Sequence, residues 1–167
     1  MIRALLLMAA AAILAGCGLR PLYQGGASGS VATTLRSVQV GPIEGQAGWL
    51  VRNKLVERLG DSGTSGDARY RLEVELDDDI TSFGIRGDRA ATRERRTLRA
   101  RYQLVEVGRG TVVLDATAGS DAGIDVVSSE YATVAAEQTA LERLAEAVAD
   151  QIAARLALFA ARGAAAK

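Results

Sequence analysis

The chain has 167 residues, of which 49% are hydrophobic, so it is long enough for one packed domain and hardly for two. Lysine and arginine together number 20, as do aspartate and glutamate, so no net charge favours a nucleic-acid partner. The absence of histidine removes the commonest general base and metal ligand, and the single cysteine excludes an internal disulfide.

The first sixteen residues, MIRALLLMAAAAILAG, predict a secretory signal peptide. Arg3 supplies a positive start, an apolar run from Ala4 to Ala15 follows, and small residues end the segment. The run is shorter than the roughly 20 residues that span a bilayer. It also lacks the polar face of an amphipathic helix buried in a core.

The residues Leu14-Ala15-Gly16-Cys17, directly after this leader, resemble the lipobox of bacterial lipoproteins. In that class cleavage falls before the cysteine, which then carries a diacylglycerol and an N-acyl chain. Cys17 is therefore the predicted lipid attachment residue, and no other cofactor is expected. Two or three long acyl chains hold a protein at a membrane almost permanently, whereas one myristoyl chain binds only marginally. The alternative is an ordinary signal peptide followed by a free thiol.

Small polar residues and glycine from Gln24 to Thr34 predict a flexible tether. Four regions follow from this reading: a signal peptide over 1–16, a lipidated N-terminus with its tether over 17–34, one folded domain over 35–162 and a short tail over 163–167.

Helix and strand patterns succeed each other through the domain. The first strand is predicted over 35–43, where Pro42 ends it, and the first helix over 47–60, where Gly60 ends it. Alternating polar and apolar residues predict three more strands, over 69–77, 92–107 and 111–120. A hairpin turn is predicted at 108–110.

A last, long helix is predicted over 128–162. Val134, Leu141 and Val148 recur in it at seven-residue spacing, and Ser128 or Ser129 can cap its start.

The order β-α-β-β-β-α predicts an α+β fold, a two-layer sandwich in which two helices pack on one face of a four-stranded mixed sheet. The first helix connects two parallel strands, and the last three strands form an antiparallel meander. Because the strands alternate rather than run apolar throughout, the face away from the helices is expected to be polar.

Arginine is concentrated in one stretch, with seven between residues 86 and 101. One interpretation is a cross-strand ladder in which these arginines pair with Glu73, Glu75 and Asp77 on the neighbouring strand. The other is a site for an anionic partner, either a phosphorylated glycolipid or the acidic lumen of another protein, because guanidinium groups bind phosphate and carboxylate bidentately. Both stay open, and the candidate contacts are Arg93, Arg95, Arg96, Arg99 and Arg101.

The segment SFGIRG at 82–87 predicts a loop between two strands. Phe83, Ile85 and Arg86 form a candidate docking loop, and the alternative is that Phe83 and Ile85 cover the edge of the core. No catalytic or metal site is predicted. The GDSG turn at 60–63 has no histidine to activate its serine, and the DDD run at 77–79 lacks the spacing of an EF-hand.

Three segments carry a resemblance to the LPS-assembly lipoprotein family (LptE) in its alphaproteobacterial form. They are CGLRPLY at 17–23, FGIRGDRAATR at 83–93, and the run from SSEYATV to AARL at 128–156. The family's fold, two helices on a four-stranded sheet, agrees with the order predicted above.

The resemblance implies a protein that is not an enzyme. Such lipoproteins are anchored by lipid on the periplasmic side of the outer membrane, where they help to assemble and plug the LPS-translocon β-barrel (LptD) and contact lipopolysaccharide in transit. Gly18 fits this location, since an Asp after the cysteine is similar to an inner-membrane retention signal in enteric bacteria. Two alternatives remain: a periplasmic adaptor lipoprotein of a lipid-shuttling inner-membrane transporter, and an anchored hydrolase, which would need a base.

Overall fold

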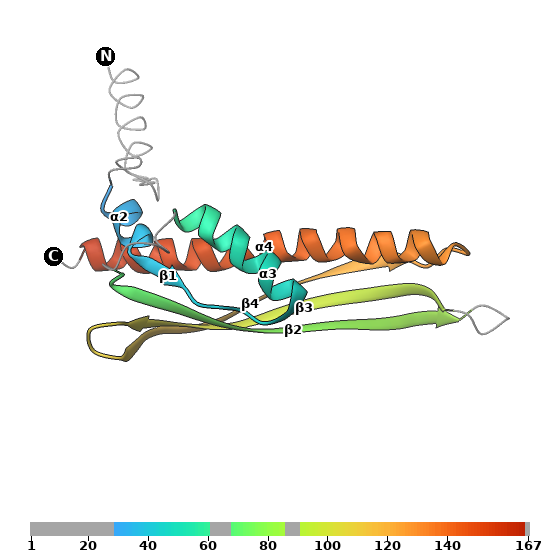
Figure 1. The fold of residues 1–167 in the computed structure, drawn as a ribbon, viewed down its shortest axis with the longest axis horizontal. Coiled ribbons are helices and arrows are strands. Elements are labelled where there is room, and N and C mark those ends of the chain that lie inside the picture. Colours follow the sequence, from blue (N-terminus) through green and yellow to red (C-terminus); the bar gives the residue numbers. More distant parts are fainter. Residues whose placement is uncertain (1–28, 61–67, 86–90, 166–167) are drawn as a thin grey trace, which may run out of the picture.

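A computed structural model of the chain describes residues 29–60, 68–85 and 91–165. The helices and strands are α2 (Ser30–Arg36), β1 (Val38–Val40), α3 (Gly45–Leu59), β2 (Tyr70–Ile85), β3 (Ala91–Glu106), β4 (Thr111–Asp125) and α4 (Glu130–Ala165). The four strands form one sheet in the order β1-β2-β3-β4, with β1 parallel to β2 and the other pairs antiparallel. The helices lie on one side of this sheet, which confirms the predicted α+β sandwich (Figure 1).

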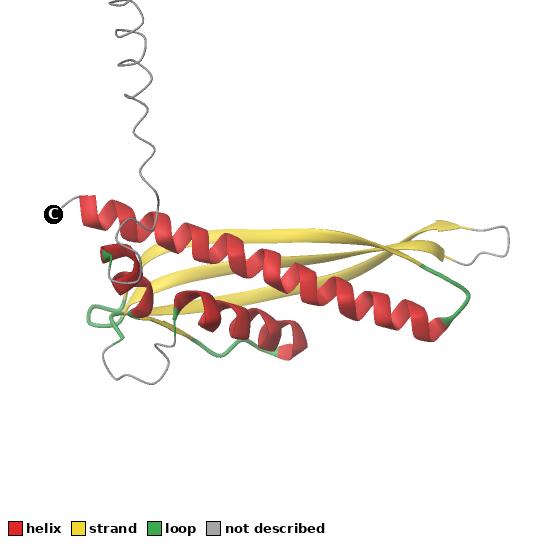
Figure 2. Ribbon diagram, turned by 90° about the horizontal axis from the view of Figure 1, so that it is seen from above, coloured by secondary structure: helices red, strands yellow, loops and turns green. Residues whose placement is uncertain are grey.

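The core lies between the sheet and the helices. On β3 the alternate residues Leu98, Ala100, Tyr102 and Leu104 are at most 2% exposed, as the alternation predicts. They meet a stripe on α4, which crosses the sheet diagonally beside α3 (Figure 2). The stripe consists of Leu141, Leu144, Val148, Ile152 and Leu156. Burying each such side chain contributes about 1.5–3 kcal/mol.

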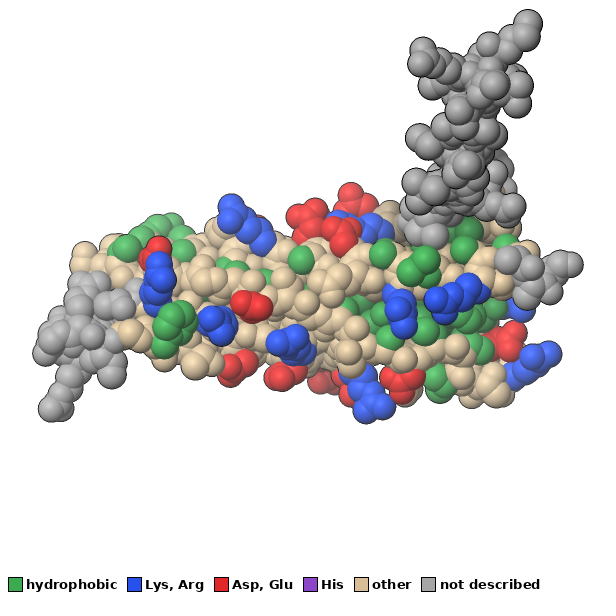
Figure 3. All heavy atoms as spheres, turned by 180° about the vertical axis from the view of Figure 1, so that it is seen from behind, with side chains coloured by type: hydrophobic (Ala, Val, Ile, Leu, Met, Phe, Trp, Pro, Cys, Tyr) green, Lys and Arg blue, Asp and Glu red, His purple; other side chains and the backbone are tan. Residues whose placement is uncertain are grey.

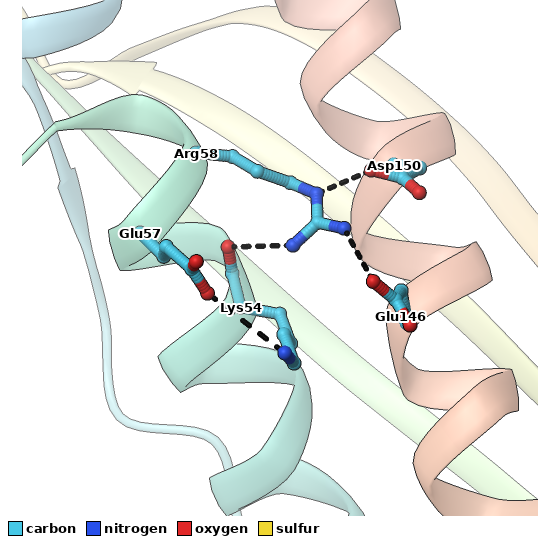
Figure 4. Close-up of polar contacts among 5 residues, drawn as sticks. All are labelled: Lys54, Glu57, Arg58, Glu146 and Asp150. Atoms are coloured by element: carbon cyan, nitrogen blue, oxygen red, sulfur yellow. Dashed lines mark hydrogen bonds and ion pairs between the residues drawn. The ribbon is translucent and has the colours of Figure 1, made fainter.

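An ion cluster on the surface joins α3 to α4. Arg58 on α3 donates through Nε to Asp150 and through Nη2 to Glu146 Oε1 at 3.4 Å, both on α4 (Figure 4). The hydrogen bond to Asp150 is the main reason that the pKa of Arg58 is raised above its usual value. The cluster therefore fixes how the shorter helix lies along the longer one.

The turn between β3 and β4 and the start of α4 lie where the sequence predicted them. In the hairpin turn between β3 and β4, the N–H groups of Arg109 and Gly110 both donate to the carbonyl of Glu106, and Gly110 adopts a φ of 64° that favours glycine. At the start of α4, Ser129 Oγ accepts a hydrogen bond from the N–H of Ala132 at 3.4 Å. The capping role predicted for one of the two serines therefore falls to Ser129.

The predicted tether is wrong over Ser30–Thr34, where the chain forms helix α2. Val31 and Leu35 on this helix are 6% and 4% exposed and belong to the core. The folded body therefore begins before Leu35, and the first strand is only Val38–Val40. Burial of two side chains four residues apart against α4 outweighs the low helix propensity of the Ser, Thr and Gly residues around them.

The loop predicted at 82–87 is wrong over Ser82–Ile85, which belong to β2, while the docking role suggested for this segment stays a prediction. Phe83 is paired with Arg93 and Ile85 with Ala91 on β3, so strand pairing continues into the segment that was predicted to be a loop. Helix α4 likewise continues to Ala165, which turns most of the predicted tail into helix.

The signal peptide, Cys17 and the rest of 17–28, and Arg86 lie outside the described residues, and their predicted roles stay predictions. No helix in the described ranges combines the length and the hydropathy needed to cross a membrane.

Two leucines of α4 test how far stability depends on this packing. Leu156 is 1% exposed and Leu158 is 41% exposed, so Leu156→Ala and Leu158→Ala change the same residue type on the same helix. We expect Leu156→Ala to lower the free energy of unfolding by about 2–5 kcal/mol, because it leaves a cavity. Leu158→Ala should cost less than about 1 kcal/mol. Urea unfolding followed by circular dichroism measures both, and equal losses would contradict the assigned core.

Candidate functional site

The face of the sheet away from the helices carries most of the charged side chains of β2, β3 and β4. Acidic and basic side chains are both seen along the lower margin of the molecule in Figure 3, which views the layers from the side. The face holds Arg71, Glu73, Glu75, Asp77 and Asp79 from β2; Arg93, Arg95, Arg99 and Arg101 from β3; and Asp115, Asp121 and Asp125 from β4. Carboxylates outnumber arginines on these three strands, so this open face is not a basic patch.

The arginines of β3 form a ladder, but with β4 instead of the predicted partner β2. Arg93 Nε lies 3.0 Å from Asp125 Oδ1, Arg95 Nε lies 3.9 Å from an oxygen of Asp121, and Arg101 Nη2 lies 3.2 Å from Asp115 Oδ2. The second and third pairs are diagonal in the strand register, where long side chains still reach each other. Alternation alone could not say which neighbouring strand would supply the carboxylates.

Two of the three predicted acidic partners make no ion pair within the described residues. Glu73 pairs with Arg71 on its own strand at 3.0 Å, while Glu75 and Asp77 make no such contact. Because the pairs with β4 are exposed to solvent, each contributes little to stability. Their main consequence is that most of the arginine charge on this face is already neutralised.

Arg96 does not belong to the open face. Its side chain is 13% exposed and forms a bidentate pair with Asp78, with distances of 2.8 Å to Oδ1 and 2.6 Å to Oδ2. Its Nη1 donates to the carbonyl oxygen of Glu137 on α4 at 3.0 Å. The hydrogen bond to Asp78 is the main cause that raises the pKa of Arg96. Arg96 therefore joins β2, β3 and α4, and the alternation of the strand could have revealed that it faces the helices.

Arg99 differs from the other arginines of β3 because it makes no ion pair within the described residues. Its side chain lies over Gly119 of β4, where an added Cβ would be 2.8 Å from Arg99 Cδ. A groove of about 520 Å³ crosses the middle of the sheet beside this contact. Glu75, Asp77, Arg99, Arg101 and Thr117 line it together with Gly119.

Gln151 of α4 closes the edge of the sheet at this groove. The N–H of Gly119 donates to Gln151 Oε1 at 3.2 Å, and Gln151 Nε2 donates to the carbonyl of Gly119 at 3.1 Å. The side-chain amide thus takes the place that a peptide unit of a further strand would occupy.

Phe83, from the predicted docking segment, is 42% exposed near the end of β2. The guanidinium carbon of Arg95 lies 5.6 Å from the centre of its ring, in a cation–π contact worth about 0.5–1 kcal/mol at an exposed site. Phe83 and Arg95 therefore come together through strand pairing, which the loop prediction could not foresee.

The open face of the sheet offers charged side chains that can bind ions. An exposed guanidinium can hold a phosphate or a carboxylate, but the described residues show no group of three or more metal-ligating side chains. The fold and the open face thus define a small α+β protein that presents a charged surface.

Comparison with known proteins identifies the family. The sequence model of LptE, described as lipopolysaccharide-assembly, matches residues 35–156, and the chain belongs to this family. It is therefore a lipoprotein of the lipopolysaccharide-assembly type, located in the cell envelope, and the family is not one of enzymes. No curated protein matches the chain.

Solved structures share the fold. A protein of Caulobacter crescentus CB15 described as a lipoprotein has a TM-score of 0.64 and 27% identity, over 81% of this chain and 98% of that one. A minor lipoprotein of Acinetobacter baumannii has a TM-score of 0.59 and 15% identity, over 74% of this chain and 92% of that one. Rare lipoprotein B of Shewanella oneidensis has a TM-score of 0.52 and 10% identity, over 77% of this chain and 96% of that one.

The ladder predicts the titration of Asp115. Hydrogen bonds from Gln103 and then from Arg101 lower the pKa of this carboxyl below the ordinary 3.8. A lowered pKa in the folded state means that the stabilisation is present above the unfolded pKa and is lost as pH falls through the folded pKa.

We expect the midpoint of Asp115 in a carboxyl-detected NMR titration to lie below 3.8, and to move towards 3.8 in Gln103→Ala. Gln138→Ala, which removes a glutamine from α4 on the other side of the sheet, is the control and should leave the midpoint unchanged. An unshifted Asp115 in the unsubstituted protein would contradict the ladder.

Proposed function

We propose that the protein is an outer-membrane lipoprotein that helps to assemble the lipopolysaccharide-translocon β-barrel, occupies its lumen and contacts lipopolysaccharide during transport to the cell surface. The observation that carries the proposal is the LptE family match over residues 35–156. The proposal includes lipid attachment at Cys17, which follows a lipobox-like sequence, and an anchor on the periplasmic side of the outer membrane.

The open face of the sheet supports the part of the proposal that concerns the barrel. The lumen of a membrane β-barrel is polar, and a plug within it needs a surface that can form hydrogen bonds and ion pairs across the contact. The face supplies arginines and carboxylates in alternation along three strands. Interspersed charge of both signs suits a lumen of mixed polarity better than a uniformly acidic one.

The groove supports the part that concerns the glycolipid. Arg93, Arg95 and Arg101 are neutralised by carboxylates of β4, so they have less capacity for a further anion. Arg99 keeps its guanidinium free of ion pairs within the described residues and lies beside a groove of about 520 Å³. We therefore assign phosphate contact to Arg99 ahead of the other arginines of β3.

Affinity purification tests the partner. We expect the tagged full-length chain, purified from detergent-solubilised membranes, to retain one large outer-membrane β-barrel in one-to-one ratio. A Cys17→Ser variant should lose its membrane anchor, which fractionation measures. Recovery of an inner-membrane transporter in place of a barrel would favour an adaptor function and overturn the proposal.

A second experiment tests the contact with lipopolysaccharide. We expect Arg99→Gln to weaken binding of the purified chain to lipopolysaccharide by about threefold to tenfold, because one charge-assisted contact to a phosphate is lost. Arg143→Gln removes the same charge from an exposed site on α4 and should bind as the unsubstituted chain does. Equal weakening by both variants would show that overall charge, and not the groove, determines binding.

A further inference from the structure

Strand β2 is bare along most of its outer edge. Strand β1 pairs only with Tyr70, Arg71 and Leu72, while β2 itself continues to Ile85 and pairs with β3 throughout (Figure 1). Beyond Leu72 no strand of the described chain lies on the outer side of β2. A long edge with free backbone groups is a template for another strand, and folded proteins usually cover or shorten such an edge.

The backbone directions identify which groups this edge presents. The carbonyl of Leu72 points outward, since it accepts a hydrogen bond from the N–H of Gly41 at 2.9 Å. In a strand the N–H and C=O of one residue point to the same side, and the side alternates at each residue. The register with β3 contains no bulge, so Leu76, Asp78, Ile80 and Ser82 also direct their backbone groups outward.

The edge is also uncovered by side chains. Every residue from Asp77 to Gly84 is exposed, whereas Leu98, which is paired with Asp78 on β3, is fully buried. The cause is the position of the long helix, because α4 packs mainly on β3 and β4 and meets β2 near its start, where the ring of Phe159 contacts that of Tyr70. Helix α3 packs beside α4, so the far half of β2 has no helix above it.

The opposite edge of the sheet is protected at its middle. The amide of Gln151 pairs with both backbone groups of Gly119 in the middle of β4. A strand arriving at β4 would have to break both hydrogen bonds first. Within the described residues no side chain makes this contact along Leu76–Ser82 of β2, so a partner strand meets the lower barrier there.

The charge along this edge of β2 determines which kind of partner strand can pair with it. Glu75, Asp77 and Asp79 line the open face of this edge, and none of them makes an ion pair within the described residues. A second copy of the chain would place carboxylates opposite carboxylates, which is unfavourable in a cross-strand pair. A segment with lysine or arginine at every second position would instead oppose each carboxylate with a cation.

We propose that the edge of β2 over Leu76–Ser82 is a docking site that binds an extended, basic segment of a partner polypeptide by strand addition. Backbone hydrogen bonds supply the pairing, and the carboxylates of Glu75, Asp77 and Asp79 select cationic side chains. The proposal does not rest on the proposed function, because the edge and its charge are properties of this fold alone.

The test uses the full-length chain in non-ionic detergent micelles and a soluble eight-residue peptide that alternates lysine and valine. One control peptide carries glutamate in place of lysine. A second keeps the lysines but replaces each valine by proline, so it has the same charge and cannot form a strand.

Amide hydrogen exchange, followed residue by residue, is the readout. With free peptide at about ten times its dissociation constant, we expect exchange at Leu76, Asp78, Ile80 and Ser82 to slow about elevenfold. The intervening amides, which already bond to β3, should change little. Neither control peptide should produce this alternate pattern.

Two variants separate the contribution of backbone hydrogen bonds to peptide binding from that of side-chain charge. Ile80→Pro removes an outward N–H without breaking the ladder with β3, and it should abolish the alternate protection while thermal unfolding confirms the fold. Glu75→Gln with Asp77→Asn should weaken the peptide by about threefold to tenfold, because two cross-strand ion pairs are lost. Glu130→Gln with Glu142→Gln, on the exposed side of α4, is the charge-matched control and should bind normally.

Three results would overturn the proposal. The first is no binding of the lysine–valine peptide. The second is binding without alternate protection, or equal binding of the proline peptide, which would mean attraction between charges alone. The third is protection that depends on the concentration of the protein without peptide, which would assign the edge to a second copy of the chain.

Discussion

The packing of α4 across β3 and β4 is the interaction on which the rest of the structure depends. Its apolar stripe, which includes Leu141, Val148 and Ile152, meets the alternate apolar residues of the central strand. This contact gives the sheet one dry face and leaves the other face polar. Helices α2 and α3 both pack on α4 as well as on the edge of the sheet. A single helix thus determines which surfaces of the sheet remain available for binding.

The charges of the open face form a system that is largely balanced within the sheet. Arginines of β3 reach carboxylates of β4, and of the acidic side chains that β2 places on this face only Glu73 has an arginine partner within the described residues. The face is therefore divided into a neutralised half over β3 and β4 and an acidic half over β2. Arg99 lies at the boundary, where Gly119 makes room for its side chain. A small anion and a cationic strand would accordingly meet different parts of one surface.

The two edges of the sheet differ in how their backbone groups are covered. Gln151 closes β4, whereas the short β1 leaves most of β2 open. Like charges along the acidic edge of β2 oppose self-association, and in the docking proposal the same carboxylates attract a basic segment.

The sequence by itself determined the α+β class, the four main strands and the two long helices, because each depends on local periodicity. Alternation in 92–107 and heptad spacing around Leu141 can be read without knowing the partner surface. Cys17 and its leader are likewise a local pattern. The inward direction of Arg96 was also present in the alternation.

Only the tertiary structure decided the features that depend on contacts between distant segments. Helix α2 forms because Val31 and Leu35 are buried against α4, not because its residues favour helix. Strand β2 extends through Gly84 because β3 pairs with it as far as Ile85. The arginine ladder runs to β4 because diagonal register brings Asp115 and Asp121 within reach. The edge of β2 is bare beyond Leu72 because β1 pairs with it only over Tyr70, Arg71 and Leu72, and such pairing of distant segments leaves no periodic signal.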